Sequence, residues 1–313
     1  MKKRRIVLLC MLCLSAGLLC ACGKADDTSN ISSNTTITEA PSSDERGDEQ
    51  MNLETTSTPI PTVTPSPSPT ELPTATPSPS PTELPTATPV PKDNGLWENN
   101  ADISWIDPAK PMIAFTFDDG PVGTADTATS IRIQNALAAS GQHATFFYWG
   151  HSLNTGTEAE IKRAYDMGFE IGNHTSTHQD LSKLTPDKIL TEVETQAEKL
   201  SAITGLEHFL IRPPYLSAAS IVKTTVNEPL INCSIDTKDW AGASAEDIIN
   251  TINTQKKDGA IVLMHETYDS TATAVEILVP QLVAEGWQIV SVSELFKAKG
   301  QNLLDGQVYN NAR

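Results

Sequence analysis

Two short sequence motifs combine residues that could bind a metal ion and transfer protons. Asp118 and Asp119 are adjacent carboxylates, and His174 and His178 lie four residues apart. That spacing places two imidazoles on one helical face or in one tight loop, where both can reach a single divalent ion. Two histidines and one carboxylate leave coordination positions open, as in a catalytic rather than a structural metal site. Adjacent residues at a strand end point in different directions, so one of the two aspartates can bind the metal while the other accepts a proton.

Three further clusters contain polar residues that could take part in catalysis. Arg212-Pro213-Pro214-Tyr215 contains two prolines, which stiffen the loop and fix the arginine beside it. The second is Asp236-Thr237-Lys238-Asp239-Trp240, and the third is Ile261-Val262-Leu263-Met264-His265-Glu266. His265 directly follows an apolar run, at a position that suits a general acid. Taken singly, each cluster also fits a structural role, as a rigid connection, a turn or a packed histidine.

The surrounding sequence alternates between two kinds of predicted element. Apolar runs predict strands at residues 112–117, 144–148, 169–171, 209–212, 230–235, 260–264 and 288–290. Helical patterns cover residues 127–140, 158–166, 185–205, 245–255 and 274–284. Such alternation is typical of parallel βα units, and about seven strands favour a barrel. Because each polar cluster follows a predicted strand, we expect all of them to meet at the carboxyl end of the barrel.

In this order, the five clusters resemble the polysaccharide deacetylase family with the NodB homology domain (carbohydrate esterase family 4). The resemblance extends over about residues 110–296 and implies an α/β domain with a distorted (β/α)7 barrel. It also implies that Asp119, His174 and His178 hold one divalent metal ion, with zinc favoured over cobalt, nickel or manganese.

The same resemblance implies a role for each remaining cluster. Asp118 would be the general base that activates the attacking water, oriented by Arg212. Asp236 would pair with His265 and keep it protonated as the general acid. Three residues would contact the substrate. The backbone amide of Tyr215 would bind the oxyanion, and Trp240 and Leu263 would surround the acetyl methyl group.

Three residues depart from the family pattern. Leu216 stands where a glycine usually follows Tyr215, so we expect this loop not to adopt a glycine-only conformation. Gln179 replaces a proline after His178, and Glu266 replaces an aspartate after His265. None of the three is a metal ligand or a proton-transfer group, so they bear on substrate fit.

The amino terminus has the features of a bacterial export signal. Four basic residues precede an apolar stretch at residues 6–19, which is shorter than the ~20 residues of a transmembrane helix. Leu19-Cys20-Ala21-Cys22-Gly23 resembles a lipobox, which predicts cleavage before Cys22 and its lipidation. A plain signal peptide or an uncleaved anchor is the alternative. An anchored lipoprotein would lie outside the cytoplasm.

Between this signal (residues 1–22) and the folded domain (residues 96–313), residues 23–95 form a predicted disordered linker. The segment TPSPSPTELPTA occurs at 64–75 and again at 76–87, and its prolines favour polyproline II.

The formal net charge of −17 disfavours nucleic acid as a partner. Cys233 is the one cysteine in the folded part and is expected to be a small buried apolar residue, and the protein is expected to be a monomer.

The leading functional hypothesis is N-deacetylation of N-acetylglucosamine residues in an extracellular polysaccharide, with peptidoglycan as the preferred candidate. An O-deacetylase of acetylated xylan, a non-catalytic glycan-binding protein and a metal-binding surface lipoprotein remain as alternatives. His143, His151 and His208 fall outside every cluster and are expected to be structural or on the surface.

Overall fold

The computed structural model describes residues 97–313, and the predicted signal, Cys22 and linker lie outside the described residues. The strands are β1 (Met112–Asp118), β2 (Thr145–Tyr148), β3 (Glu170–Asn173), β4 (Leu230–Ile231), β5 (Ile235–Asp236), β6 (Ala260–His265), β7 (Gln288–Val290) and β8 (Val308–Tyr309). The α-helices are α1 (Thr129–Ala139), α2 (Glu158–Asp166), α3 (Pro186–Thr204), α4 (Ser220–Thr225), α5 (Ala245–Gln255), α6 (Asp269–Ala284) and α7 (Val292–Ala298). Within residues 97–313, none of these helices has the length and apolar character needed to cross a membrane.

The strands form a distorted parallel barrel, which confirms the predicted α/β class. They pair in the order β3-β2-β1-β6-β5, and β7 pairs with the first half of β1. Ile211 bridges Asn173 of β3 and Leu230 of β4, also in parallel. The segment 230–236 therefore closes the ring, because its first part pairs with Ile211 and its last part with β6.

β1 is the central strand and is buried along its whole length. Successive side chains of a strand point to opposite faces. Ile113, Phe115 and Phe117 accordingly pack in the cluster that includes α1 and α6, whereas Met112 and Ala114 pack in the cluster that includes α7. By this alternation, the Asp118 side chain lies on the same face of β1 as Met112 and Ala114, at the carboxyl end of the strand.

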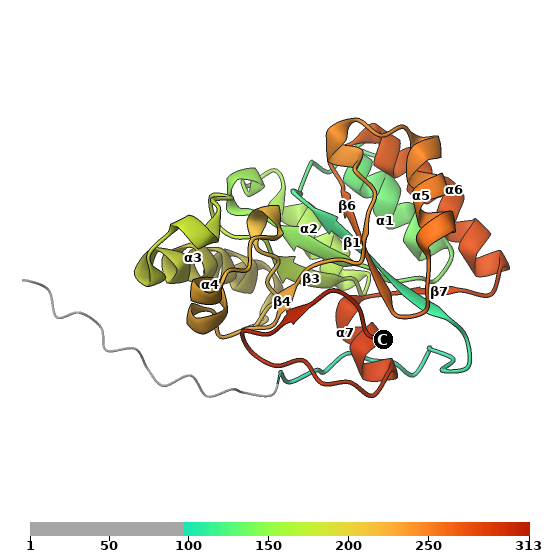
Figure 1. The fold of residues 1–313 in the computed structure, drawn as a ribbon. Helices are drawn as coiled ribbons and strands as arrows, with labels where there is room; N and C mark the ends of the chain where they lie inside the picture. Colours follow the sequence, from blue (N-terminus) through green and yellow to red (C-terminus); the bar gives the residue numbers. More distant parts are fainter. Residues whose placement is uncertain (1–96) are drawn as a thin grey trace, which may run out of the picture. The chain divides into compact units, whose positions relative to one another are not determined.

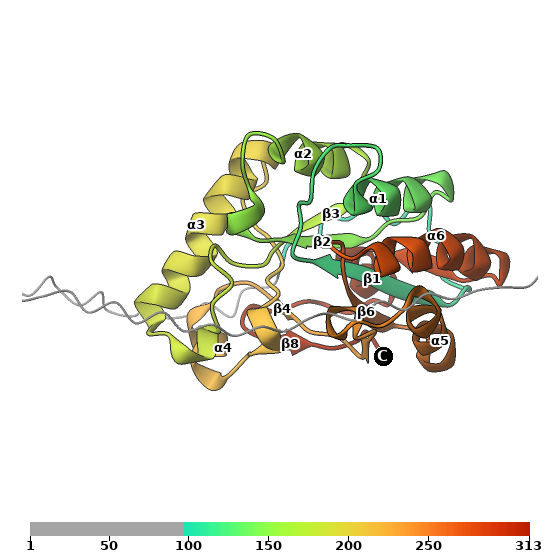
Figure 2. The ribbon, with the colours of Figure 1, turned by 90° about the horizontal axis from the view of Figure 1, so that it is seen from above.

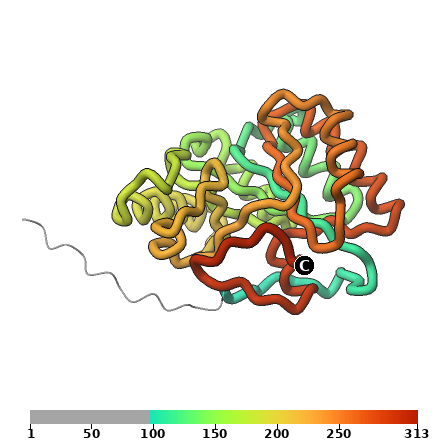
Figure 3. Tube along the Cα trace, in the orientation of Figure 1, coloured from blue at the N-terminus to red at the C-terminus, as the bar shows by residue number. Residues whose placement is uncertain are grey.

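The helices surround the strands on the outside (Figure 1). In the view from above, α3, α2, α1, α6 and α5 follow one another around the sheet (Figure 2). Residues near the carboxyl terminus run beside the first described residues (Figure 3), and the Trp97 N–H donates to the carbonyl of Leu303 at 3.0 Å.

Several element boundaries differ from the prediction. Residues 230–235 were expected to be one strand, but Asn232 to Ser234 interrupt it, because the chain changes partner from Ile211 to β6 there. Residues 209–212 make only isolated bridges at Ile211. Three elements have no counterpart among the predicted ones: α4, α7 and β8, each of seven residues or fewer.

Candidate active site

The predicted metal ligands converge at the carboxyl ends of β1 and β3. Asp119, His174 and His178 each offer one ligand atom, and these atoms lie within 4.8 Å of one another. The Asp119 Oδ1 atom is 3.5 Å from His174 Nε2 and 3.4 Å from His178 Nε2. Ligands of one tetrahedral ion, each about 2.0–2.1 Å from it, lie about 3.4 Å apart. Asp119 Oδ1 is also buried without a hydrogen-bond partner, so these residues fit a divalent metal ion.

Each histidine is held by its own local contacts. His174 Nδ1 donates to the carbonyl of Arg212 at 2.7 Å, which leaves Nε2 as the ligand atom. His178 lies in a tight loop and not on a helix, because Thr175 and His178 both have a left-handed backbone. The carboxylate of Glu192 on α3 accepts from the N–H of Thr177 at 2.7 Å and so holds the loop. Burial and the nearby His174 lower the pKa of His178, which favours the neutral form that binds metal.

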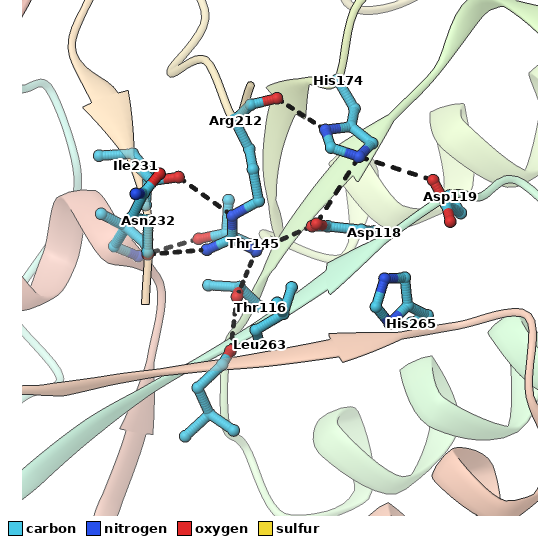
Figure 4. A network of polar contacts seen from close by, with 12 residues as sticks. Thr116, Asp118, Asp119, Thr145, His174, Arg212, Ile231, Asn232, Leu263 and His265 are labelled. Atoms are coloured by element: carbon cyan, nitrogen blue, oxygen red, sulfur yellow. Dashed lines mark hydrogen bonds and ion pairs between the residues drawn. The ribbon is translucent and has the colours of Figure 1, made fainter. Parts of the chain in front are cut away.

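Asp118 lies beside the metal ligands and is paired with Arg212, as predicted. The guanidinium donates from Nη1 to Asp118 Oδ1 at 2.8 Å and to Thr116 Oγ1 at 2.6 Å (Figure 4). Arg212 is fully buried and lies 4.3 Å from the ring centroid of Phe147. A Cβ at Gly172 would lie 2.3 Å from the Phe147 ring, so only glycine leaves room for this stack.

The predicted pair of Asp236 with His265 is wrong, and Asp239 takes that place. His265 Nδ1 donates to Asp239 Oδ1 at 2.8 Å, and the His265 N–H donates to Asp239 Oδ2 at 2.6 Å. Asp239 begins a short 3-10 helix and is buried, and Thr271 of α6 also donates to it at 2.7 Å. Burial lowers the pKa of His265, but the bond to Asp239 and the charge of Asp118 outweigh it and the net shift is upward.

Asp236 instead supports the exposed aromatic rim of the site. Its carboxylate accepts from the Lys238 N–H at 2.9 Å and from the indole Nε1 of Trp240 at 3.3 Å. Trp240 is 55% exposed and Tyr215 is 70% exposed. The Tyr215 ring packs edge-on against His178, with 5.0 Å between the centroids. Leu263, in contrast, is buried in β6.

Sequence reasoning missed Asp239 and the aromatic Tyr268. Asp236 and Asp239 stand in one five-residue motif, and no property of the sequence distinguishes the one that turns inward. Tyr268 is partly exposed next to α6, and its ring lies edge-on to His265 with 5.9 Å between the centroids.

Comparison with known proteins identifies the family. The family model described as Polysaccharide deacetylase matches residues 106–229. A peptidoglycan-N-acetylglucosamine deacetylase of Bacillus cereus is 30% identical over 206 residues, which cover 63% of this chain and 94% of that protein. The chain belongs to the polysaccharide deacetylase family.

The other relatives of this chain differ in their length and in the substrate that their names give. A bifunctional xylanase/deacetylase of Pseudobutyrivibrio xylanivorans is 31% identical over 194 residues, 61% of this chain and 31% of that protein. The chain spans less than half the length of the first curated relatives it matches. A solved structure described as "T48 deacetylase with substrate" has a TM-score of 0.60 and 30% identity, and the match covers 66% of this chain and all of that one.

Leu216, one of the departures from the family pattern, has a backbone conformation that is uncommon for a residue with a side chain. Leu216 has a φ of 55° and Tyr215 a φ of 58°, so both take the left-handed conformation that glycine adopts most easily. The Leu216 N–H donates to the carbonyl of Pro213 at 3.0 Å, and this turn holds the loop in place.

Glu266, a second departure, fills the space beside Gly120, in the loop that carries Asp119. It is fully buried, and a Cβ at Gly120 would lie 1.3 Å from Glu266 Oε1. Burial and then the charge of Glu160 raise the pKa of Glu266 well above its usual range. Glu160 accepts from the N–H groups of Val122 and Gly123 at 3.0 and 2.6 Å, so both acids act on the loop that carries Asp119.

Replacing His178 with Gln should weaken the binding of Zn²⁺ or Co²⁺ by at least about 100-fold, because one of three ligands is lost. Calorimetric titration of the metal-free protein measures this affinity. His151→Gln is the matched control, since His151 contacts Trp149 beside the site but is not a ligand. Equal affinity of the two variants would remove His178 from the site.

Proposed function

We propose that this protein is a metal-dependent deacetylase that removes acetyl groups from N-acetylglucosamine residues of peptidoglycan. One observation carries the proposal. Two charge-paired proton-transfer groups, Asp118 with Arg212 and His265 with Asp239, lie next to the three metal ligands. The Bacillus cereus relative supports the choice of peptidoglycan. The xylanase/deacetylase relative favours acetylated xylan as the second candidate substrate.

The base side of the site is built to accept a proton from water. A bound divalent ion, proposed to be zinc with cobalt, nickel or manganese as alternatives, would polarise the acetyl carbonyl and acidify water. Asp118 faces the metal ligands, with Oδ2 3.7 Å from His174 Nε2, and Arg212 holds its other oxygen. The carboxylate therefore has one oxygen fixed and one directed at the reaction centre, which suits a general base.

The acid side is built to deliver a proton to the leaving group. Asp239 accepts from the His265 Nδ1–H, which leaves Nε2 as the ring nitrogen that can face the substrate. The His265 ring lies at the same end of the strands as Asp118 and Asp119 (Figure 4). The upward pKa shift keeps the ring protonated at higher pH. His265 can thus protonate the amine as the carbon–nitrogen bond breaks, and the Tyr215 N–H is proposed to donate to the developing oxyanion.

The exposed rim suits a sugar ring. Tyr215 and Trp240 present aromatic faces beside the metal ligands and the acid, and Leu263 closes the inner side of the proposed acetyl pocket. Aromatic faces stack on the apolar face of a sugar, while Asp236 keeps the Trp240 indole in one orientation.

Acetate release from peptidoglycan, N-acetylated chitooligosaccharides and acetylxylan, measured in parallel with added metal, tests the proposal. We expect release from the N-acetylated substrates, and an about 10²–10⁴-fold loss in Asp118→Asn with metal still bound. Asp187→Asn, an exposed carboxylate of α3, is the control and should be unaffected. Release from acetylxylan alone would indicate an O-deacetylase, and no release with any metal would indicate a non-catalytic protein.

The pH profile distinguishes Asp239 from Asp236. A general acid acts while protonated, so kcat/KM should fall as the pH rises through the pKa of His265. Asp239→Asn removes the hydrogen-bonded charge that raises this pKa and should move the alkaline limb to lower pH. Asp236→Asn should leave the limb in place while weakening substrate binding through Trp240. The reverse pattern would restore Asp236 as the partner of His265.

We further propose that the protein is a monomeric lipoprotein on the outer side of the cell membrane, anchored through Cys22. The basic and apolar leader and the lipobox-like sequence support this proposal. Cys22→Ala should shift the protein from the membrane fraction to the medium or leave it as an unprocessed precursor, as seen by immunoblot of cell fractions. Unchanged processing and membrane retention would rule out lipidation at Cys22.

A further inference from the structure

A second hollow lies at the opposite end of the strands from the metal ligands. It is an open cavity of about 830 Å³, within the range of about 300–1,000 Å³ found for small-molecule sites. Glu170, the first residue of β3, lines it, whereas His174 follows the last residue of the same strand. The cavity and the proposed active site are therefore separated by the length of β3 and have no lining residue in common.

One segment, residues 97–106, brings two tryptophans to this cavity. Asn99 Nδ2 donates to the carbonyl of Ser293 at 2.7 Å, and Lys297 Nζ donates to the carbonyl of Ala101 at 2.6 Å. These contacts, with that of Trp97 to Leu303, fix the segment against α7 and the carboxyl-terminal residues. Trp97 and Trp105 both line the cavity and are only half-buried.

The wall around Trp105 is held by a buried carboxylate. Trp105 Nε1 donates to Glu294 Oε1 at 2.9 Å, and His143 Nδ1 lies 2.6 Å from the same oxygen. The Trp105 and His143 rings are in contact, with 4.7 Å between their centroids. His143 is thus structural, as expected from the sequence, and the aromatic wall has a defined shape.

The cavity is acidic. Its described lining contains no lysine or arginine, and besides Glu294 it contains six carboxylates, Glu98, Asp102, Glu170, Glu207, Glu228 and Asp305. Burial raises the pKa of Glu170 and of Glu228, although Thr145 and Ser293 hydrogen-bond the first and His208 lies 3.8 Å from the second. A ligand that carries positive charge would relieve this electrostatic cost.

We propose that this cavity is a second saccharide site, which binds glycan segments that carry free amino groups. Aromatic faces favour sugar rings and nearby ammonium groups, and carboxylates pair with the ammonium groups. The source of the ligand rests on the proposed function, because hydrolysis of an acetamide leaves a cationic amino sugar in place of a neutral one. The site would hold the domain on glycan that has already been deacetylated.

Calorimetric titration of the full chain with a glucosamine tetrasaccharide tests the proposal. Trp97→Ala should weaken binding by about tenfold, and Trp97→Phe should retain most of it. Glu207→Gln should weaken binding less, and high salt should weaken it in the unaltered protein. The N-acetylated tetrasaccharide, which lacks the positive charges, should show no loss of affinity in Trp97→Ala.

Trp240→Ala is the matched control, because it removes an exposed tryptophan from the other site. If Trp240→Ala abolishes tetrasaccharide binding and Trp97→Ala does not, the ligand binds only at the active site and the proposal is wrong. Equal binding of a tetralysine peptide would also overturn it, since the cavity would then select charge and not sugar. Absence of acetate release would count against the proposed function alone, because the titration does not depend on turnover.

Discussion

The buried ion pair between Arg212 and Asp118 is the constraint on which the site depends. Arg212 has no exposed surface, and a buried charge without its partner costs about 3–5 kcal/mol. Its Nε donates to the carbonyl of Ile231 and its Nη2 to that of Asn232, at 3.1 and 3.2 Å. Both carbonyls belong to the segment that closes the barrel. The hydrogen bonds of Arg212 are therefore complete only when the barrel is closed, so the position of the proposed base depends on the closing segment.

Residues with an energetically unfavourable backbone conformation are also concentrated at this end of the barrel. Six non-glycine residues of the described chain have a left-handed backbone, and all lie in the loops of the site: Asp119, Thr175, His178, Tyr215, Leu216 and Lys238. Each such residue costs about 1–3 kcal/mol unless its surroundings stabilise it. Hydrogen bonds to side chains, such as that of the Thr175 N–H to Asn173 at 2.8 Å, hold these loops in conformations that a free chain would leave.

Elements that depend on a local sequence pattern could be predicted from the sequence. Features whose position depends on contacts between distant residues could not. Strands buried on both faces, such as β1 and β6, are continuous apolar runs and were readily predicted. The break within residues 230–235 depends on a change of pairing partner, which no local pattern records. The same holds for Asp239, whose inward position depends on His265 and Thr271. The capping box of Ser291 and Glu294, in contrast, was a readable signal for α7 that the apolar periodicity alone did not reveal.

The pairing of β1 with β6 places Asp118 directly opposite His265. Neighbouring strands lie about 4.8 Å apart, a spacing that main-chain hydrogen bonds determine and side chains hardly alter. The separation of the proposed base and the proposed acid is thus a property of the sheet, while Tyr215 and Trp240 are carried by short 3-10 helices outside the strands. Under the proposed function, substitutions in these 3-10 helices would change which polymer the domain binds without changing the distance between the base and the acid, because that distance is determined by the pairing of β1 with β6.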